Sequence, residues 1–173
     1  MHAFLSNNRD ELIARCKAKV SKRRNRSATD EQLRNGVPLF LDQLIRTLIM
    51  EEAGIADVAV LLSGPSGGDA LALSEIGVAA AAHGKASLAL GFTVDQVVHH
   101  YGDLCQAIPE LAHERDAPFQ VDEFRTLNRC LDNAIADAVS AFCAQRDSEV
   151  ADRVSSEANE RLGVLVHELR DTL

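Results

Sequence analysis

The stretch from Phe142 to Leu162 contains neither proline nor glycine, and this limits the possible fold more strongly than any other feature. Its apolar residues recur once in every four positions among charged neighbours: Val150, Val154, Ala158 and Leu162. Such a narrow apolar stripe cannot be buried inside a globule, but it can pair with the same stripe of a second copy in a parallel coiled coil. We therefore expect a long helix and a homodimer, with a solvent-exposed helical tail as the alternative.

Helical patterns recur along the rest of the chain, whereas strand patterns are scarce. Between Pro38 and Gly54, apolar residues follow the i, i+3, i+4, i+7, i+8 spacing of an amphipathic helix, in which proline suits the first turn and glycine the end. These residues are Leu41, Leu44, Ile45, Leu48 and Ile49. The 173 residues are long enough for one core, so we expect an all-α protein with a long C-terminal helix.

Capping and breaking residues predict the other helix boundaries. Capping-box spacing places helix starts at Asn8 with Glu11, Thr29 with Gln32, and Thr93 with Gln96. The first of these helices should end near Arg24, and the third should be disturbed at Pro109. Further helices are expected over 69–90 and from Val121 onward. Residues 57–68 begin as either a short helix or an extended piece and end as a glycine-rich loop.

Charge argues against binding to nucleic acid. The net charge is -8, whereas affinity for a phosphate backbone depends on lysine and arginine displacing counterions. One basic cluster is the exception, and we interpret it as the solvated end of the first helix. It comprises Lys17, Lys19, Lys22, Arg23, Arg24 and Arg26.

The cysteines and the apolar runs indicate the compartment. Cys16, Cys105, Cys130 and Cys143 form no Cys-x-x-Cys pair, so we expect no zinc or haem-attachment motif and interpret them as small buried residues in a reducing compartment. The first ten residues lack the pattern of a secretory signal, and no apolar run approaches the roughly 20 residues that cross a bilayer. We expect a soluble, cytoplasmic protein without membrane contact.

His167 lies beside a wider apolar face that follows the stripe on the same helix. That face consists of Leu162, Leu165, Val166, Leu169 and Leu173. Phosphoryl transfer to histidine needs an imidazole nitrogen open to an incoming nucleotide and a carboxylate that orients the ring and accepts its proton. Glu168 is adjacent, and Arg170 could counter the charge of a phosphorylated ring. His167 and Glu168 are therefore the candidate catalytic residues.

The segment His167-Glu168-Leu169-Arg170 resembles the HisKA-type phosphoacceptor box of sensor histidine kinases, which reads His-Glu-Leu-Arg-Asn-Pro-Leu. The resemblance implies that His167 takes the γ-phosphoryl group of ATP and that Glu168 is its acid/base partner. Asp171 stands where the family usually has Asn or Thr, so phosphatase activity does not follow from the resemblance. Thr172 replaces the proline that commonly kinks the helix, so a straighter helix is expected.

The chain lacks the motifs of a nucleotide-binding domain, including a Walker sequence and a glycine-rich lid. If the resemblance holds, ATP is bound by a catalytic domain that this sequence does not contain, and the partner that receives the phosphoryl group is a response regulator. We accordingly expect the sequence to be cut from a longer kinase.

A second resemblance covers roughly residues 5 to 145. It is carried by His83-Gly84, by Leu88, by the run from Gly91 to Val98, and by Tyr101 and Leu104. These residues are similar to the helical N-terminal domain of RsbR-family stressosome regulators, which also occurs ahead of histidine kinases. The likeness implies a globin-like or bundle-like fold that is dimeric and without haem, and it supplies no catalytic residues.

A globin-like fold raises the question of haem, for which His83, His99 and His100 are the candidate ligands. The small residues around 79–82 indicate no large apolar pocket, so we interpret these histidines as surface or hydrogen-bonded structural residues and expect no cofactor. A metal site from His99, His100 and Asp103 has no second pair at matching spacing, and we expect none.

Three functions stay open from sequence. The leading one is a sensory and dimerisation module of a two-component kinase, with a sensory domain over 1–145 and a signalling helix over 146–173 that ends in the phosphoacceptor segment. The second is a globin-like sensor that binds haem or a small molecule, which an absorbance spectrum would test. The third is a free-standing phosphotransfer protein, although such proteins usually have Lys-Gly after the histidine rather than Arg170-Asp171.

Overall fold

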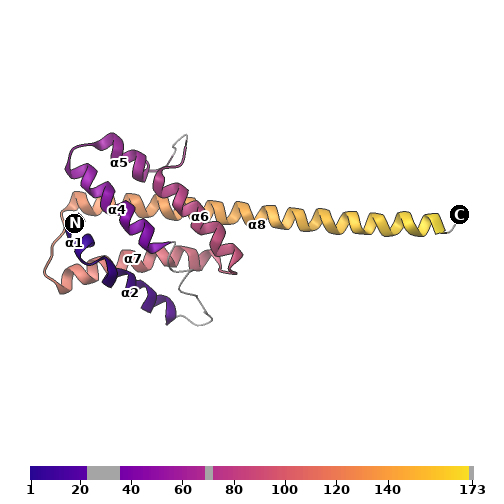
Figure 1. Ribbon diagram of the computed structural model, residues 1–173, viewed down its shortest axis with the longest axis horizontal. Coiled ribbons are helices and arrows are strands. Elements are labelled where there is room, and N and C mark those ends of the chain that lie inside the picture. The colour runs from indigo at the N-terminus through magenta and orange to yellow at the C-terminus, as the bar shows by residue number, and fades with distance from the viewer. Residues whose placement is uncertain (23–35, 69–71, 172–173) are drawn as a thin grey trace.

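The computed structural model describes residues 1–22, 36–68 and 72–171, and over these ranges the chain is helical without any strand. The helices are α1 (His2–Asn7), α2 (Arg9–Ser21), α4 (Val37–Glu52), α5 (Ala56–Ser63), α6 (Glu75–Ala89), α7 (Val94–Glu114) and α8 (Val121–Asp171) (Figure 1). The expected all-α class with a long C-terminal helix is therefore confirmed.

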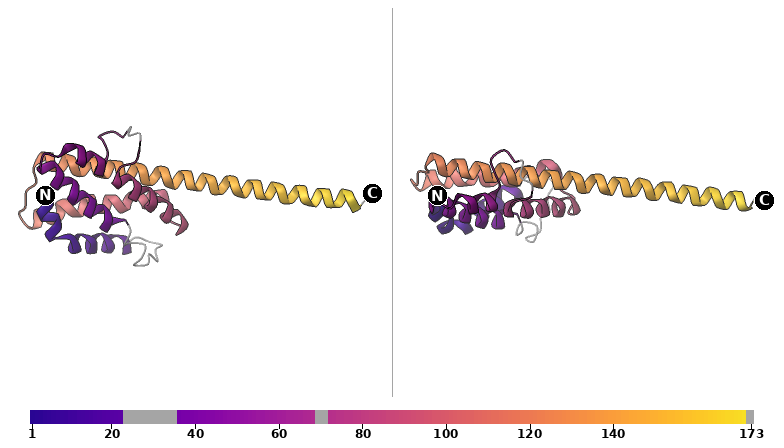
Figure 2. Two further views of the ribbon diagram at one scale, coloured as in Figure 1. Left: turned by 45° about the horizontal axis from the view of Figure 1, so that its top comes forward. Right: turned by 90° about the horizontal axis from the view of Figure 1, so that it is seen from above.

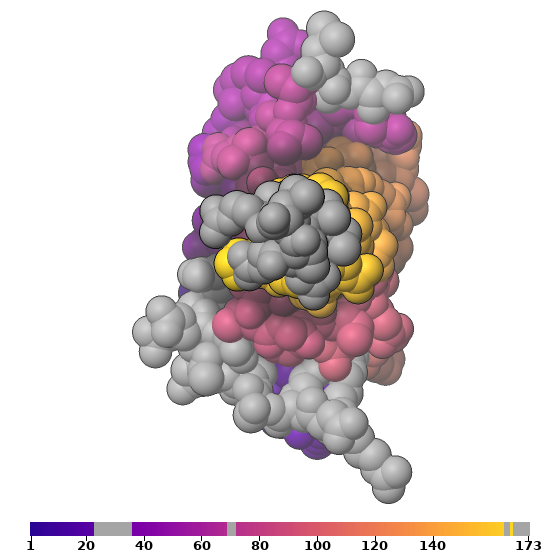
Figure 3. Space-filling model, turned by 90° about the vertical axis from the view of Figure 1, so that its right-hand side faces the viewer, coloured from indigo at the N-terminus to yellow at the C-terminus, as the bar shows by residue number. Residues whose placement is uncertain are grey.

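The molecule consists of a helical bundle and a single helix that projects from it (Figure 1). Seen from above, α7 and the first part of α8 lie in one layer, and α2 and α4 lie in the other (Figure 2). Figure 3 looks along α8 toward the bundle, and the projecting part of the helix emerges between α6 and α7.

The bundle core is built from aliphatic side chains and alanines, as a sequence with only 4% aromatic residues requires. Each helix except α5 contributes to this core, because its apolar residues fall on one face at helical spacing. The fully buried large side chains include Leu5, Leu12, Leu41, Leu44, Ile76, Leu104, Ile108, Leu111 and Leu127.

Helices α6 and α8 pack closely, and two glycines of α6 make this possible. A Cβ atom added at Gly84 would overlap the backbone carbonyl of Ala138, and one added at Gly77 would overlap the carboxylate of Asp137. The backbones of α6 and α8 are therefore in direct contact at Gly84, with no side chain between them. A displacement of α6 toward α8 at this point therefore has to move α8 as well.

Hydrogen bonds and an ion pair connect α4 and α5 to α8. Arg129 forms an ion pair with Glu51 and donates to the Ser63 hydroxyl at 3.2 Å. The Asn133 amide donates to the carbonyl oxygens of Ser63 at 2.7 Å and Pro65 at 3.0 Å, which holds the start of the glycine-rich loop.

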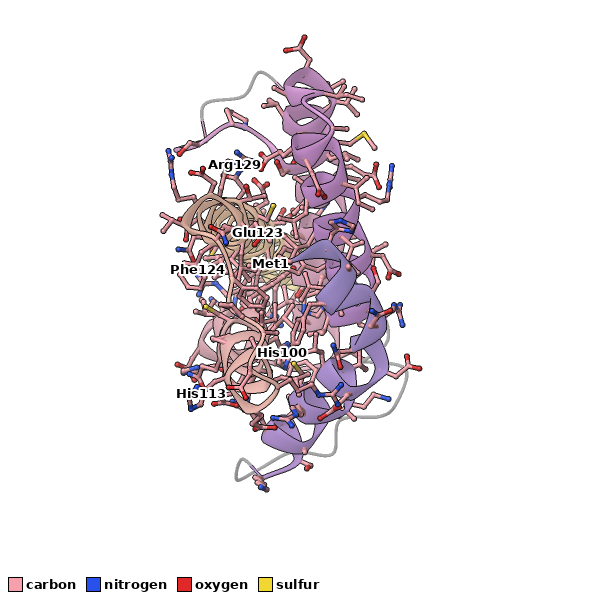
Figure 4. The ribbon with its side chains drawn as sticks, turned by 90° about the vertical axis from the view of Figure 1, so that its left-hand side faces the viewer. Met1, His100, His113, Glu123, Phe124 and Arg129 are labelled. Carbon is pink, nitrogen blue, oxygen red and sulfur yellow. The ribbon has the colours of Figure 1, made fainter. Side chains whose placement is uncertain are left out.

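At the N-terminus of the chain, the amino group of Met1 pairs with Glu123 of α8, and the two residues lie side by side in Figure 4.

Several predicted boundaries agree with the structure. Thr93 and Gln96 form a complete capping box, with the Gln96 amide 3.3 Å from the Thr93 hydroxyl and the Thr93 amide 3.1 Å from the Gln96 side-chain oxygen. Pro38 lies in the first turn of α4, and Gly54 follows its end with a φ of +74°. Helix α8 begins at Val121 as expected.

The helix start predicted at Asn8 is confirmed, because Asn8 is the N-cap residue of α2, but the capping box predicted with Glu11 does not form. The Asn8 side chain turns back and donates to the Phe4 carbonyl at 2.7 Å, while its oxygen accepts from Arg115. The chain bends at Asn8, so α1 and α2 are separate helices. Helix α2 ends at Ser21, and the predicted end at Arg24 lies outside the described residues.

Three other boundaries differ from the prediction or resolve an alternative. Helix α6 begins at Glu75, where the Ser74 hydroxyl caps the Gly77 amide at 3.1 Å, and the predicted start at Asp69 lies outside the described residues. Helix α7 continues through Pro109, because buried residues on both sides of the proline hold the helix in the core: Ile108, Leu111 and Ala112. Residues 57–62 are helical.

Two predictions fall partly or wholly on undescribed residues. The start predicted at Thr29 with Gln32 lies outside the described ranges. In the basic cluster, Lys19 pairs with Glu110 of α7 at 3.0 Å, whereas Arg23, Arg24 and Arg26 also lie outside those ranges.

Candidate functional site

The projecting part of α8 carries the predicted stripe in full exposure. Phe142 is the last buried residue among those of α8 whose side chains the structure describes, and every residue from 146 to 164 is exposed. Val154 is 61% exposed and Leu162 is 59% exposed. Because water surrounds this helix on all sides, its stripe is available to a second helix.

His167 is exposed on the same helix, about 32 Å beyond Arg146 if α8 rises about 1.5 Å per residue. The backbones of Glu168 and Asp171 belong to α8, but their side chains lie outside the described part of the structure, as does all of Thr172. The relative geometry of His167 and Glu168 therefore stays a prediction. What the arrangement offers chemically is an imidazole that solvent can reach on an extended helix.

A cluster of rings inside the bundle was not predicted. His83 of α6 lies with its ring centroid 5.6 Å from that of His100 and 5.9 Å from that of Tyr101, both on α7. Phe40 packs on Tyr101 at 5.6 Å, and Phe92 packs on His100 at 5.4 Å. Figure 4 shows His100 on the inner side of α7, facing the bundle.

Three of these rings line a cavity of about 20 Å³, which we call the ring cavity. Its rings are those of His83, His100 and Tyr101, and its apolar wall is formed by Ile13, Cys16, Val20 and Val37; Lys17 and Gly36 complete the lining. About 10–15 Å³ is enough for one water molecule, so the cavity has room for a molecule of very few atoms. Ile13, Lys17 and Val37 are the lining residues that are only partly buried.

The His83 Nε2 atom is buried and has no hydrogen-bond partner among the described residues. The residue is 8% exposed, and burial lowers the pKa of its imidazole below the usual value. Burial also raises the pKa of Cys16 to about 12 and, together with the charge of Asp137, raises the pKa of Tyr101. The groups with shifted pKa values around the ring cavity are therefore held in their uncharged forms at neutral pH.

The histidines are divided between surface and core in a way that the sequence interpretation missed. His99 is exposed and lies 3.3 Å from Asp95, whereas His100 and Asp103 are buried. His99 therefore points away from the other two members of the considered metal trio, and no group of three or more potential metal ligands occurs within the described ranges. One signal could have placed His100 inside: it follows Val97 by three positions, on the apolar face of α7.

The ring cavity does not fit haem. Sites for ligands of drug size usually enclose about 300–1,000 Å³, and this cavity is more than tenfold smaller. Its two histidines also contact each other through their rings, which leaves no space for a porphyrin between them.

The four cysteines are free thiols in the structure. Cys16 and Cys130 are buried, in agreement with their interpretation as small core residues, and Cys105 and Cys143 are partly buried. Burial raises the pKa of Cys130 to about 11, so its thiol is protonated at neutral pH.

None of the described helices is both long enough and apolar enough to cross a membrane. Searches with models of protein families, against curated proteins and against solved structures found no match to this chain.

Proposed function

We propose that this chain is the signal-sensing and dimerisation module of a cytoplasmic two-component sensor histidine kinase, and that it regulates phosphorylation of His167. The observation that supports the proposal is the continuity of α8, because one uninterrupted helix is packed into the bundle through Phe142 and then carries His167 into solvent. In this proposal, ATP is bound by a catalytic domain elsewhere, and the phosphoryl group passes to a response regulator.

A signal in the bundle reaches His167 through the packing of α8. Signalling requires two arrangements of the bundle that differ by only a few kcal/mol, so that an input can favour one of them. The contact of Gly84 with the Ala138 carbonyl couples α6 to α8 tightly, because neither backbone can move toward the other. Rotation or translation of α6 then turns or shifts the whole of α8, including its exposed end.

The proposed module is a homodimer because the projecting helix needs a partner. Most of the stability of helices in proteins comes from the packing of an apolar face, and this helix exposes apolar side chains that a coiled coil would cover. Light scattering at micromolar concentration is expected to give twice the mass of the chain. A protein that stays monomeric would contradict the proposed dimer.

Two exposed residues of the projecting helix form a matched pair for testing the dimer surface. Val154 is on the stripe and 61% exposed, whereas Ser156 is exposed on the opposite face, 200° around the helix from Val154 at about 100° per residue. Val154→Lys is expected to dissociate the dimer, because charge at the seam is desolvated and repelled by its twin. Ser156→Lys should leave the dimer intact. Equal effects of the two substitutions would count against this stripe as the seam.

Phosphorylation is tested on the natural gene product isolated from its own cells under alkaline conditions, which preserve phosphohistidine. We expect acid-labile phosphate on the wild type and none on His167→Gln, with a normal circular dichroism spectrum. His113→Gln is the matched control, because His113 is an exposed histidine of the bundle (Figure 4) and its loss should change nothing. Acid-labile phosphate that persists in His167→Gln would refute the phosphoacceptor assignment.

A further inference from the structure

The stripe of the projecting helix continues upstream, onto the part of α8 that belongs to the bundle. Ala136, Cys143 and Val150 are spaced seven residues apart, which is the repeat of a coiled coil. At about 100° per residue, Cys143 lies about 20° and Ala136 about 40° around the helix from Val150, both in the direction of Val154. Because α8 is one uninterrupted helix, these residues face the same way as the stripe (Figure 1).

The bundle leaves this side of α8 accessible. Helix α8 lies in the same layer as α7, and α2 and α4 form the other layer (Figure 2). The exposed residues Arg125, Asn128, Asp132 and Ala136 of α8 all lie within about 40° of Val150 around the helix axis. The solvent-facing side of α8 in the bundle and the stripe therefore point in one direction.

This side of α8 carries no charge near the point where the helix leaves the bundle. Between Asp132 and Arg146 the charged residue is Asp137, which lies about 140° from Val150 and contacts α6 at Gly77. The side chains that face outward there are small or apolar, as contacts between helices require. We call them the seam face, which consists of Ala136, Val139 and Cys143.

The stripe alone offers little area for a stable dimer. Burial of a large aliphatic side chain removes about 60–120 Å² from water, so Val150, Val154 and Leu162 account for roughly 200–350 Å² per chain. A specific interface buries about 800 Å² per partner, more than half of it apolar. The seam face supplies further apolar area that directly adjoins the stripe.

We propose that the seam face is an interface with a second copy of this chain, arranged in parallel, so that the two bundles of the dimer contact each other along α8. The inference rests on the dimer of the proposed function and adds the faces by which the bundles meet. Axes of packed helices are about 8–10 Å apart, and Cα atoms lie about 2.3 Å from each axis, which leaves about 3.5–5.5 Å between facing Cα atoms. A disulfide joins Cα atoms about 4.4–6.8 Å apart, so the two Cys143 thiols should lie within reach of each other.

The test is oxidation of the full chain with diamide, which takes up two electrons and two protons as two thiols form one disulfide bond. Non-reducing electrophoresis then measures the covalent dimer. Covalent dimer is expected from the wild type and should be lost in Cys143→Ser. Cys105→Ser is the matched control, because Cys105 is also a partly buried free thiol but lies on α7, and the covalent dimer should persist. An undiminished covalent dimer in Cys143→Ser would overturn the proposal.

A cysteine moved along the helix tests the direction of the interface. In the Cys143→Ser background, Ala136→Cys should restore the covalent dimer, because Ala136 lies on the seam face seven residues before Cys143. Ala144→Cys is the matched control, since Ala144 is another exposed alanine of α8 but lies about 100° around the helix from Cys143, and it should restore nothing. Equal crosslinking by the two variants would indicate random collision and refute the interface.

Failure of this interface is distinguishable from failure of the proposed dimer. Light scattering measures the mass without oxidation, and Val150→Cys in the Cys143→Ser background reports on the stripe itself. A dimer that crosslinks at position 150 but not at position 143 would keep the stripe as the seam and overturn the contact between bundles. A dimer that crosslinks at neither position would overturn the parallel arrangement, and a monomer would overturn both proposals.

Discussion

The two parts of α8 have the same secondary structure but different surroundings. Between Leu127 and Phe142 the helix buries one side in the core, and between residues 146 and 164 it buries nothing. The composition changes along the helix as well. Apolar residues of the first part fall every three or four positions, whereas those of the second form the narrow stripe and otherwise comprise only Ala151 and Val164. A helix that is stable within the bundle thus continues into a segment that lacks the tertiary contacts on which most helices depend.

Helix α8 therefore has two separate requirements. Its first part is stabilised by the other helices of the same chain, and its second part by whatever covers the stripe. Substitutions of the same kind should therefore act on folding in one part and on association in the other.

The largest expected contrast is between Leu127→Ala and Leu162→Ala. Leu127 is fully buried, so its truncation should lower the free energy of unfolding by about 2–5 kcal/mol, through lost burial and the cavity left behind. Leu162 is 59% exposed, so its truncation should change the stability of the bundle by less than about 0.5 kcal/mol and weaken the dimer instead. Denaturant unfolding and light scattering measure the two effects.

The predicted contrast would be contradicted if Leu162→Ala lowered the free energy of unfolding of the bundle as much as Leu127→Ala does. Such a result would mean that the bundle is stable only as a dimer, and that folding and association are a single process.

The contact between α6 and α8 provides the next contrast. Gly84→Ala should lower the free energy of unfolding by about 1–3 kcal/mol, because the new methyl group overlaps the carbonyl of Ala138 and the helices must separate. Gly102→Ala is the control within the bundle, since a Cβ there meets no atom within 4 Å, and it should stabilise α7 slightly. Equal stability of the two variants would show that α6 can move away from α8 at little cost.

Acid should weaken the bundle through His83. Its imidazole has a lowered pKa in the folded protein, so below the ordinary value of about 6.5 the unfolded chain binds a proton that the folded chain does not. Stability is therefore expected to fall as the pH decreases from about 7 through this range. Cys16 and Tyr101 also lie around the ring cavity, but their pKa values are raised, so both stay uncharged in this pH range. His100 and Lys17 line the cavity too, and both are still present when His83 is replaced.

The measurement is the thermal midpoint between pH 7 and pH 5 for the wild type, His83→Leu and His99→Leu. The slope against pH should decrease in His83→Leu and persist in His99→Leu, because of these two histidines only His83 is buried. A wild-type slope in His83→Leu would assign the acid sensitivity to other groups.

The sequence predicted those features that depend on neighbouring residues. The Thr93 capping box, the start of α8 at Val121 and its unbroken course all follow from local hydrogen bonds and helical spacing. Asn8 shows the limit, because its side chain has a competing partner in Arg115, which is 107 residues away in the sequence. The packing of the folded chain alone determines which partner the Asn8 side chain binds.

The ring cavity could not be predicted for the same reason. His83 and His100 belong to different helices, and although its spacing from Val97 places His100 on the apolar face of α7, no sequence pattern brings it together with His83 until α6 packs on α7. For His167, the sequence supplied the chemistry by resemblance, and the structure adds its position on an exposed helix; the arrangement of the neighbouring carboxylate stays a prediction.

The smallest expected effect concerns Gly163, the glycine within the projecting part of α8. A Cβ there meets no atom within 4 Å, so Gly163→Ala adds helix propensity of about 0.5–1 kcal/mol without any clash. Amide exchange should slow in the projecting part, while the free energy of unfolding of the bundle stays the same. This result would follow if the two parts of α8 open independently, as their separate contacts imply. If Gly163→Ala instead stabilises the bundle by the same amount, the whole helix unfolds as one cooperative unit, and a signal could pass along it through its stability as well as its position.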